Sequence, residues 1–265
     1  MSAPRPVSWM VYLLLGGVLL LWWLNTPPGL LGKADAVGYA VCHRIAARSF
    51  QIAGRPVSLC ARCSGQYLGF LLGTVFQLLV GRRYGNWPAR KVTVVLLALV
   101  GVYAVDGLNS FLHLLPAMER WYLYMPNNTL RLLTGTGTGI ALSAGFLPAF
   151  HRTVWRRWDE KAVFSGWRPL ALVLLLGLGL DALVLLENPL ILYPLSLLSA
   201  ASVLLILTMA YTMVWLTLTR RENCFERLGQ MSLPLAAGFT LGLLQVAALD
   251  VVRYWLTGTW DGFHL

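Results

Sequence analysis

The chain has 265 residues, of which 57% are hydrophobic and only 12% are charged. Soluble domains carry about a quarter charged residues and less apolar sequence, so this composition excludes an ordinary water-soluble globular protein. The formal net charge is +10, but the Lys and Arg residues lie in short segments between apolar runs. That placement favours orientation in a bilayer and contact with anionic lipid head groups, and it argues against nucleic-acid binding.

Apolar runs recur along the whole chain, and a helix of about 20 apolar residues is long enough to cross a bilayer. The first run, residues 9–24, ends in Trp22-Trp23-Leu24 without a small-residue cleavage pattern, which favours a retained anchor over a cleaved signal peptide. Glu187-Asn188-Pro189 joins the fifth and sixth runs so tightly that they must form an antiparallel hairpin. We therefore predict an all-α polytopic transmembrane helix bundle in one membrane domain, residues 1–265, with about seven spans (six to eight fit the pattern). The predicted spans are 8–25, 58–80, 91–115, 129–150, 168–187, 189–217 and 232–256.

The basic residues divide unevenly between the two sides of this predicted bundle. Of the 21 Lys and Arg residues, 13 fall on the side of the N-terminus and 8 on the other side. The positive-inside rule then places the N-terminus in the cytoplasm and the C-terminus outside. Residues 26–57 are expected to form an extracytoplasmic loop rich in Cys, His and Arg.

Glycines recur every four residues in three of the predicted spans. This small-x-x-x-small spacing lets helix backbones approach closely in lipid, so it predicts packing contacts, not chemistry. The glycines are Gly65, Gly69 and Gly73, then Gly135 and Gly139, then Gly238 and Gly242.

Three of the four cysteines lie in the first outer connection and at the start of the second span. Cys60 and Cys63 are three residues apart at a helix start, which puts both sulfurs on one face near the positive end of the helix dipole and favours thiolate. With Cys42 and His43 they supply the four N and S ligands of a tetrahedral zinc site. Because neighbouring residues rarely bind one ion, His43 can instead support the ligands, with Asp106 or His113 completing the coordination.

Other interpretations of these cysteines stay open. They can form a disulfide or redox-active thiols outside the membrane, or be ordinary buried or palmitoylated cysteines. One disulfide among three cysteines would leave a free thiol, which favours the metal site. Ser64 follows Cys63 where a c-type haem motif requires His. Cys224 lies in a basic loop without a Cys or His neighbour and is expected to be a reduced, unligated thiol.

Polar residues in or next to the predicted spans gather on the same side as these cysteines. Ionisable groups are costly inside a bilayer, so they suggest a functional pocket. The residues expected to line it are Arg44, Arg48, Arg62, Tyr67, Asp106, Asn109, His113, Asn128 and Arg131. The arginines, with Arg55, either form an anion pocket or serve as interfacial anchors and as partners for Asp106, Asp181, Glu187 or Asp250. His113 alone is more typical of a helix end than of a metal ligand.

Several short motifs resemble those of a known family. They are Cys42-His43-Arg44, Arg48-Ser49-Phe50, the stretch from Cys60-Ala61-Arg62-Cys63 to Tyr67-Leu68-Gly69, Asp106-Gly107, and Asn128-x-x-Arg131-x-x-Thr134-Gly135. In these residues the sequence is similar to a family of prokaryotic membrane proteins catalogued only as a domain of unknown function. The resemblance covers roughly residues 38–140 and implies a multi-pass protein of the prokaryotic plasma membrane. It ties the cysteines to Asp106 and Arg131 as one pattern and implies no activity.

Four functions fit the sequence. The first is a site for zinc or another thiophilic metal, for which we expect a structural role over a catalytic one. Four protein ligands would close the site, whereas three would leave a position open for water or substrate. The second is a membrane thiol–disulfide oxidoreductase that uses Cys60 and Cys63. The third is an accessory subunit of a larger membrane assembly, and the fourth is the handling of an anionic lipid or lipid phosphate through Arg62 and Arg131. The sequence identifies no catalytic residue and no substrate.

Overall fold

Helices make up most of the part of the chain that the computed structural model describes, residues 5–114 and 122–263. The long helices are α1 (Arg5–Asn25), α3 (Ala61–Val80), α4 (Arg90–Leu112), α5 (Asn128–Val154), α6 (Trp167–Leu185), α7 (Pro189–Leu218) and α8 (Ser232–Thr257). A shorter helix, α2 (Gly29–Val41), and two 3₁₀ helices, η1 (Ala46–Arg48) and η3 (Leu228–Met231), complete the helical elements. Strands β1 (Gln51–Ile52) and β2 (Arg55–Pro56) form one small antiparallel hairpin.

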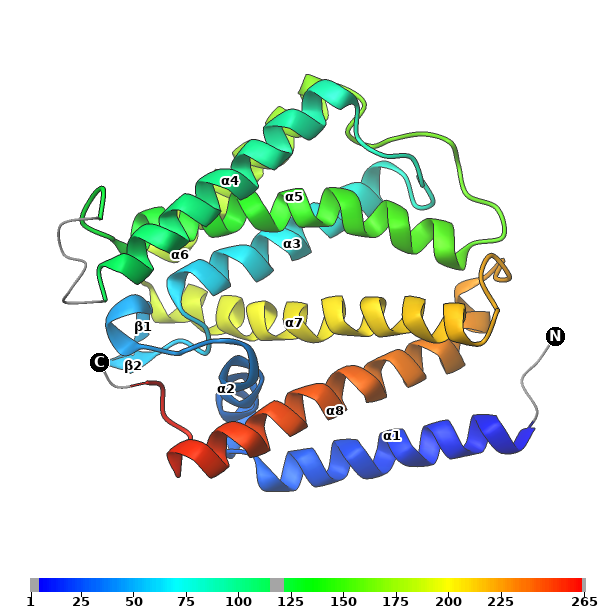
Figure 1. Ribbon diagram of the computed structural model, residues 1–265, viewed down its shortest axis with the longest axis horizontal. Helices are drawn as coiled ribbons and strands as arrows, with labels where there is room; N and C mark the ends of the chain where they lie inside the picture. The colour runs from blue at the N-terminus through cyan, green and yellow to red at the C-terminus, as the bar shows by residue number, and fades with distance from the viewer. Residues whose placement is uncertain (1–4, 115–121, 264–265) are drawn as a thin grey trace.

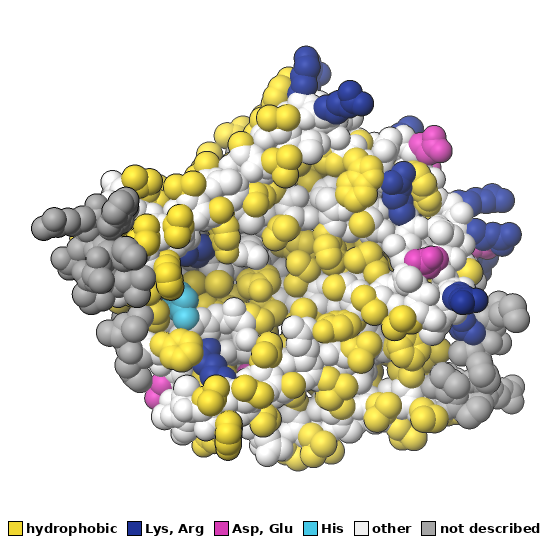
Figure 2. All heavy atoms as spheres, viewed as in Figure 1, with side chains coloured by type: hydrophobic (Ala, Val, Ile, Leu, Met, Phe, Trp, Pro, Cys, Tyr) yellow, Lys and Arg dark blue, Asp and Glu magenta, His cyan; other side chains and the backbone are white. Residues whose placement is uncertain are grey.

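Seven helices of the described chain, all except α2, are long and apolar enough to cross a membrane. The prediction of an all-α polytopic bundle with about seven spans is therefore confirmed. Many Leu, Val and Trp side chains on these helices are exposed, as expected of surfaces that lipid solvates. Figure 2 shows hydrophobic side chains across the middle of the molecule, which is the surface that contacts the bilayer.

The helices form a layered bundle around α3 and α5. Figure 1 shows these two helices together in the middle, with α7, α8 and α1 following on one side and α4 and α6 crossing them on the other. Helix α7 runs unbroken through Pro194, a residue that can interrupt a helix.

The glycine repeats have the packing role that their spacing predicts. A Cβ atom on Gly69 of α3 would lie 2.3 Å from the carbonyl oxygen of Thr136 in α5, and one on Gly139 of α5 would lie 2.1 Å from that of Gln66. Both distances are too short for any side chain, so only glycine lets the two backbones touch. Gly238 is likewise pressed against α7.

The segment 26–57, expected to be a loop, contains a buried helix. Helix α2 has 13 residues, eight of them buried, and packs against α7 and α8; Figure 1 shows it almost end-on, so it lies across the spanning helices. A helix of this length is only about 20 Å long, too short to cross a bilayer, so a search for spans misses it. Its importance is positional, because it ends directly before Cys42.

The two ends of the bundle differ in composition. At one end, which we call the basic end, three connections hydrogen-bond to one another: the Gly85 N–H donates to the Asp159 carbonyl (3.0 Å) and the Arg156 N–H to the Phe225 carbonyl (2.9 Å). Lys and Arg side chains are concentrated there in Figure 2. The opposite end, which we call the cysteine end, carries α2, the β1–β2 hairpin and residues 258–263. There the Phe263 N–H donates to the His43 carbonyl (3.0 Å).

Candidate metal centre

Three cysteines from two separate segments meet at the cysteine end. Cys42 follows the last residue of α2, Cys60 is the N-cap of α3, and Cys63 lies in the first turn of α3. Their sulfur atoms all lie within 4.8 Å of one another. Cys42 and Cys60 are buried, Cys63 is partly buried, and none of the three is in a disulfide. The fourth cysteine, Cys224, is exposed in a connection at the basic end.

A close backbone contact brings the two cysteine segments together. A Cβ atom on Gly38 in the last turn of α2 would lie 1.9 Å from the carbonyl oxygen of Ser58, two residues before Cys60. Ser58 is itself held by α7, since its N–H and hydroxyl oxygen both lie 3.2 Å from the Ser196 hydroxyl. Cys42 can therefore approach Cys60 only because residue 38 has no side chain.

Helix α8 fixes the end of α2 from the other side. The Arg253 guanidinium donates to the carbonyl oxygens of Tyr39 (2.6 Å), Cys42 (2.6 Å) and His43 (3.2 Å), and it lies 4.0 Å from the centre of the Tyr39 ring. Arg44 then turns the chain with a φ of 53°, and its side chain pairs with Asp35 of α2 at 3.0 Å. The backbone around Cys42 is thus held by contacts from α2 and α8.

The local electrostatics favour one negative charge shared among the three sulfurs. The Cys42 sulfur accepts the N–H groups of Cys60 (3.3 Å) and Arg44 (3.5 Å). Hydrogen bonds from the Cys60 and Cys63 thiols hold the pKa of Cys42 well below its usual value, and the same bond to Cys42, together with burial, raises the pKa of Cys60. The N-terminal dipole of α3 also favours thiolate at this point. Such a group can exchange its remaining protons for one thiophilic cation.

His43 is not drawn into this sulfur group. Its Nδ1 accepts the N–H of Ile45 at 3.0 Å, and burial lowers the pKa of the ring, which favours neutral imidazole. Asp106 and His113 also stay outside, so within residues 5–114 and 122–263 no His, Asp or Glu atom joins the three sulfurs. Of the predicted set Cys42, His43, Cys60 and Cys63, the structure brings together the three cysteines. Tyr67, one turn beyond Cys63, packs against the cluster that contains Cys42 and Cys60.

A hydrogen-bonded network centred on Asp106 lies next to the cysteines. The carboxylate is 1% exposed and accepts bonds from Arg62 of α3 (Nε, 3.1 Å) and from the Tyr124 hydroxyl (2.7 Å). Asn109, one turn further along α4, donates to the Tyr124 carbonyl at 2.9 Å. Burial and the bond to Asp106 raise the pKa of Tyr124 to about 12. The network joins α3, α4 and the chain before α5, so Asp106 and Asn109 position the residues around the site.

The other predicted pocket residues lie at the same end. Arg131 donates to the Asn128 amide oxygen (2.8 Å), Asn128 donates to the Ala47 carbonyl (3.3 Å), and Arg48 donates to the Ser110 carbonyl (3.1 Å). His113 makes an edge contact with the Tyr122 ring, with the ring centres 5.0 Å apart.

The expected pairing of these arginines with Asp181 or Asp250 does not occur in the described chain. Asp181 accepts the Thr136 hydroxyl instead (2.6 Å), and Asp250 accepts the Trp22 indole N–H (3.3 Å).

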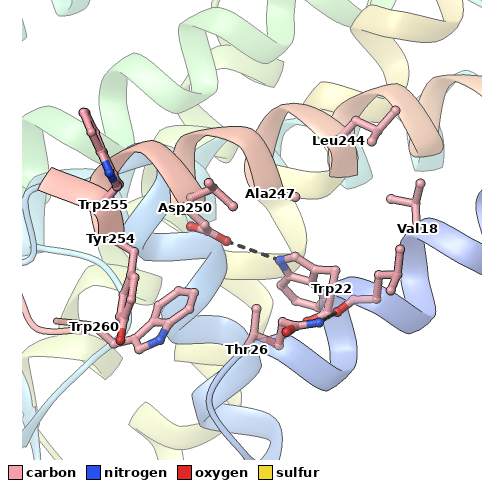
Figure 3. A pocket seen from close by; sticks show the side chains of 12 residues that line it. Val18, Trp22, Thr26, Leu244, Ala247, Asp250, Tyr254, Trp255 and Trp260 are labelled. Carbon is pink, nitrogen blue, oxygen red and sulfur yellow. Dashed lines mark hydrogen bonds between the residues drawn. The ribbon is translucent and has the colours of Figure 1, made fainter. Parts of the chain in front are cut away.

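A cavity that sequence reasoning missed lies beside the site. It has a volume of about 930 Å³ between α1 and α8, and Trp22, Asp250, Tyr254 and Trp260 line it (Figure 3). Trp22 also packs in the same core cluster as Cys42 and Cys60. The signal is weak in the sequence because Trp22 and Asp250 are 228 residues apart and only the fold brings them together.

Comparison with known proteins finds relatives of this chain. An archaeal protein of Methanocaldococcus jannaschii, named Uncharacterized protein MJ1492, is 28% identical over 122 residues, which are 46% of this chain and 71% of that protein. An uncharacterized protein of Methanothermobacter thermautotrophicus is 32% identical over 103 residues, 39% of this chain and 81% of that protein. No solved structure matches. Residues 42–144 match the family described as Predicted membrane protein (DUF2085), a segment that begins at Cys42 and contains Cys60, Cys63, Asp106 and Arg131. The resemblance in the motifs is therefore confirmed, and the chain belongs to this family of membrane proteins, DUF2085.

Proposed function

We propose that this membrane protein binds one thiophilic metal ion, with zinc as the first candidate, through Cys42, Cys60 and Cys63. The observation that supports the proposal is the convergence of three free sulfurs within 4.8 Å of one another, at the start of a helix and largely shielded from solvent. Zinc–sulfur bonds are about 2.3 Å long, and small side-chain rotations bring three sulfurs this close to one ion. Soft thiolate ligands favour zinc or copper(I) over magnesium or calcium.

The number of ligands affects the role of the metal. Structural zinc sites are closed by four protein ligands, whereas three protein ligands leave a position for water or substrate. The described chain supplies three, and the His43 ring faces the backbone of Ile45 instead. This geometry favours an open, chemically accessible metal over a purely structural one.

Metal analysis of the purified protein tests the proposal. We expect about one metal ion per chain in the wild type and its loss in Cys42→Ser and Cys60→Ser. Cys224→Ser is the matched control, because this cysteine is exposed at the basic end and should leave the metal content unchanged. If the wild type instead holds no metal and a disulfide joins two of the three cysteines, the proposal fails and the thiol–disulfide oxidoreductase becomes the better hypothesis.

We further propose that the metal centre faces the extracytoplasmic side, because the basic end then lies in the cytoplasm as the positive-inside rule requires. Cys224 is a natural reporter, since it is the exposed cysteine of the basic end. A membrane-impermeant maleimide should leave Cys224 unlabelled in intact cells and label it after permeabilisation. If Cys224 were labelled in intact cells, the basic end would lie outside the cytoplasm and the proposed orientation would be wrong.

A further inference from the structure

The arginines at the cysteine end differ in their charge partners. Asp35 pairs with both Arg44 and Arg55, and Asp106 pairs with Arg62. Arg253 donates to the backbone carbonyls of Tyr39, Cys42 and His43 and forms no ion pair with a carboxylate of the described residues. Two further guanidinium groups, Arg48 and Arg131, also form no ion pair with any carboxylate in the described part of the chain. Arg48 donates to the carbonyl of Ser110 and Arg131 to the amide oxygen of Asn128, and both acceptors are uncharged.

Arg131 is the more unusual of the two. It is 6% exposed in the first turn of α5, and its Nε has no hydrogen-bond partner. A buried charge without a counter-charge costs several kcal/mol. A bound anion would therefore stabilise the Arg131 guanidinium near the end of this spanning helix. The N-terminal dipole of α5 favours an anion at the same point.

Hydrogen bonds connect the two unpaired arginines through their neighbours. Asn128 accepts from Arg131 and donates to Ala47, the residue before Arg48. Arg48 donates to the Ser110 carbonyl (3.1 Å) and Arg62 donates to the hydroxyl of the same residue (2.8 Å), so these two guanidinium groups also lie close together. His43, Arg48 and Asn128 are each partly exposed, which leaves this place open to solvent.

We propose that Arg48 and Arg131 form a binding site for a phosphate-type oxyanion beside the three cysteines. Two unpaired cations match the charge of about −2 that a phosphate monoester carries at neutral pH. Guanidinium groups bind such oxygens with two parallel hydrogen bonds, and the Asn128 amide adds a neutral polar contact. The anion can be free phosphate or the head group of an anionic lipid. The site does not depend on the metal, because none of its groups is a cysteine.

Binding is measured on metal-free protein in a neutral maltoside detergent, by titration calorimetry in phosphate-free buffer. One arm uses inorganic phosphate and the other uses dihexanoyl phosphatidate, a short-chain lipid with a phosphate monoester head group. Arg131→Gln and Arg48→Gln should each weaken binding roughly tenfold or more, because each removes charge-assisted hydrogen bonds to the anion. Arg55→Gln is the matched control, since Arg55 is paired with Asp35 and should not affect binding. Arg131→Lys should restore only part of the affinity.

The two probes distinguish free phosphate from a lipid head group, and the variants show whether the arginines bind an anion at all. Similar affinity for both probes identifies the oxyanion as the ligand, and tighter binding of the phosphatidate identifies a lipid head group. If neither probe binds the wild type, or if both glutamine variants bind as well as Arg55→Gln, the arginines serve only to stabilise the thiolates and the proposal is overturned. Cys60→Ser should bind phosphate like the wild type, and loss of binding there would assign the anion to the cysteines instead. Should Arg131→Gln not fold, Arg48→Gln carries the test, because Arg48 is only partly buried.

Discussion

Replacing Gly38 with alanine adds a methyl group where α2 contacts the segment before α3. The new Cβ would lie 1.9 Å from the Ser58 carbonyl oxygen, whereas real contacts of this kind stay beyond 3.0 Å. The two segments must therefore separate by about 1 Å. Ser58 cannot move freely, because Ser196 of α7 holds its N–H and hydroxyl. The displacement then falls on α2 and on Cys42.

The size of the effect follows from two opposing contributions. Alanine gains up to about 1 kcal/mol over glycine in a helix, whereas overpacking a closely packed contact costs about 1–3 kcal/mol. Metal–ligand distances stay within about 0.2 Å of their usual values, so a displaced Cys42 should appear mainly as weaker metal binding. If 1–3 kcal/mol of strain opposes binding, the affinity falls roughly 5- to 150-fold.

A competition titration with a chromogenic chelator measures the affinity, and thermal unfolding in detergent measures the stability. Gly101→Ala in α4 is the control, because a Cβ there meets nothing within 4 Å and should change neither quantity adversely. If Gly38→Ala binds the metal as tightly as the wild type and unfolds at the same temperature, the contact between α2 and Ser58 does not position Cys42, and this reasoning is refuted.

Three further predictions concern the surroundings of the site. Asp106→Asn breaks the buried ion pair with Arg62 and should lower the free energy of unfolding by about 3–5 kcal/mol. Glu226→Gln, which breaks an exposed pair, should lower it by less than about 1 kcal/mol. Equal losses of stability in thermal unfolding would contradict this prediction. Gly69→Leu should force α3 from α5 and lower the unfolding temperature, whereas Gly179→Leu, with open space around it, should not; a stable Gly69→Leu protein would count against the close contact. The raised pKa of Tyr124, about 12, stabilises the folded state with the phenol protonated. That stability is fully present below the unfolded pKa of about 10 and is lost as pH rises through 12. In thermal melts against pH, Tyr124→Phe should therefore lose less stability than the wild type between these two pH values. An equal loss in both proteins would refute the raised pKa of Tyr124.

Hydropathy and local spacing made the fold class and the glycine contacts predictable. A spanning helix can be predicted from its own residues, because every backbone hydrogen bond is satisfied within the segment and lipid requires an apolar exterior. The packing role of Gly65 and Gly69 is likewise predictable from local sequence, because residues four apart lie on one face of a helix. Helix α2 was not predicted, because it is buried by α7 and α8 and is neither long nor apolar enough to be recognised from its own sequence.

The candidate site divides in the same way. The sequence by itself determined that Cys60 and Cys63 share one face at a helix start, since residues three apart on a helix are neighbours. Only the tertiary structure decided that Cys42 joins them while His43 does not, because Gly38, Ser58 and Arg253 fix where α2 ends. Only the structure also decided which arginines carry a counter-charge. Asp35 and Asp106 each form their ion pairs through side-chain positions that spacing along the chain cannot fix, whereas no carboxylate in the described chain forms an ion pair with Arg48 or Arg131.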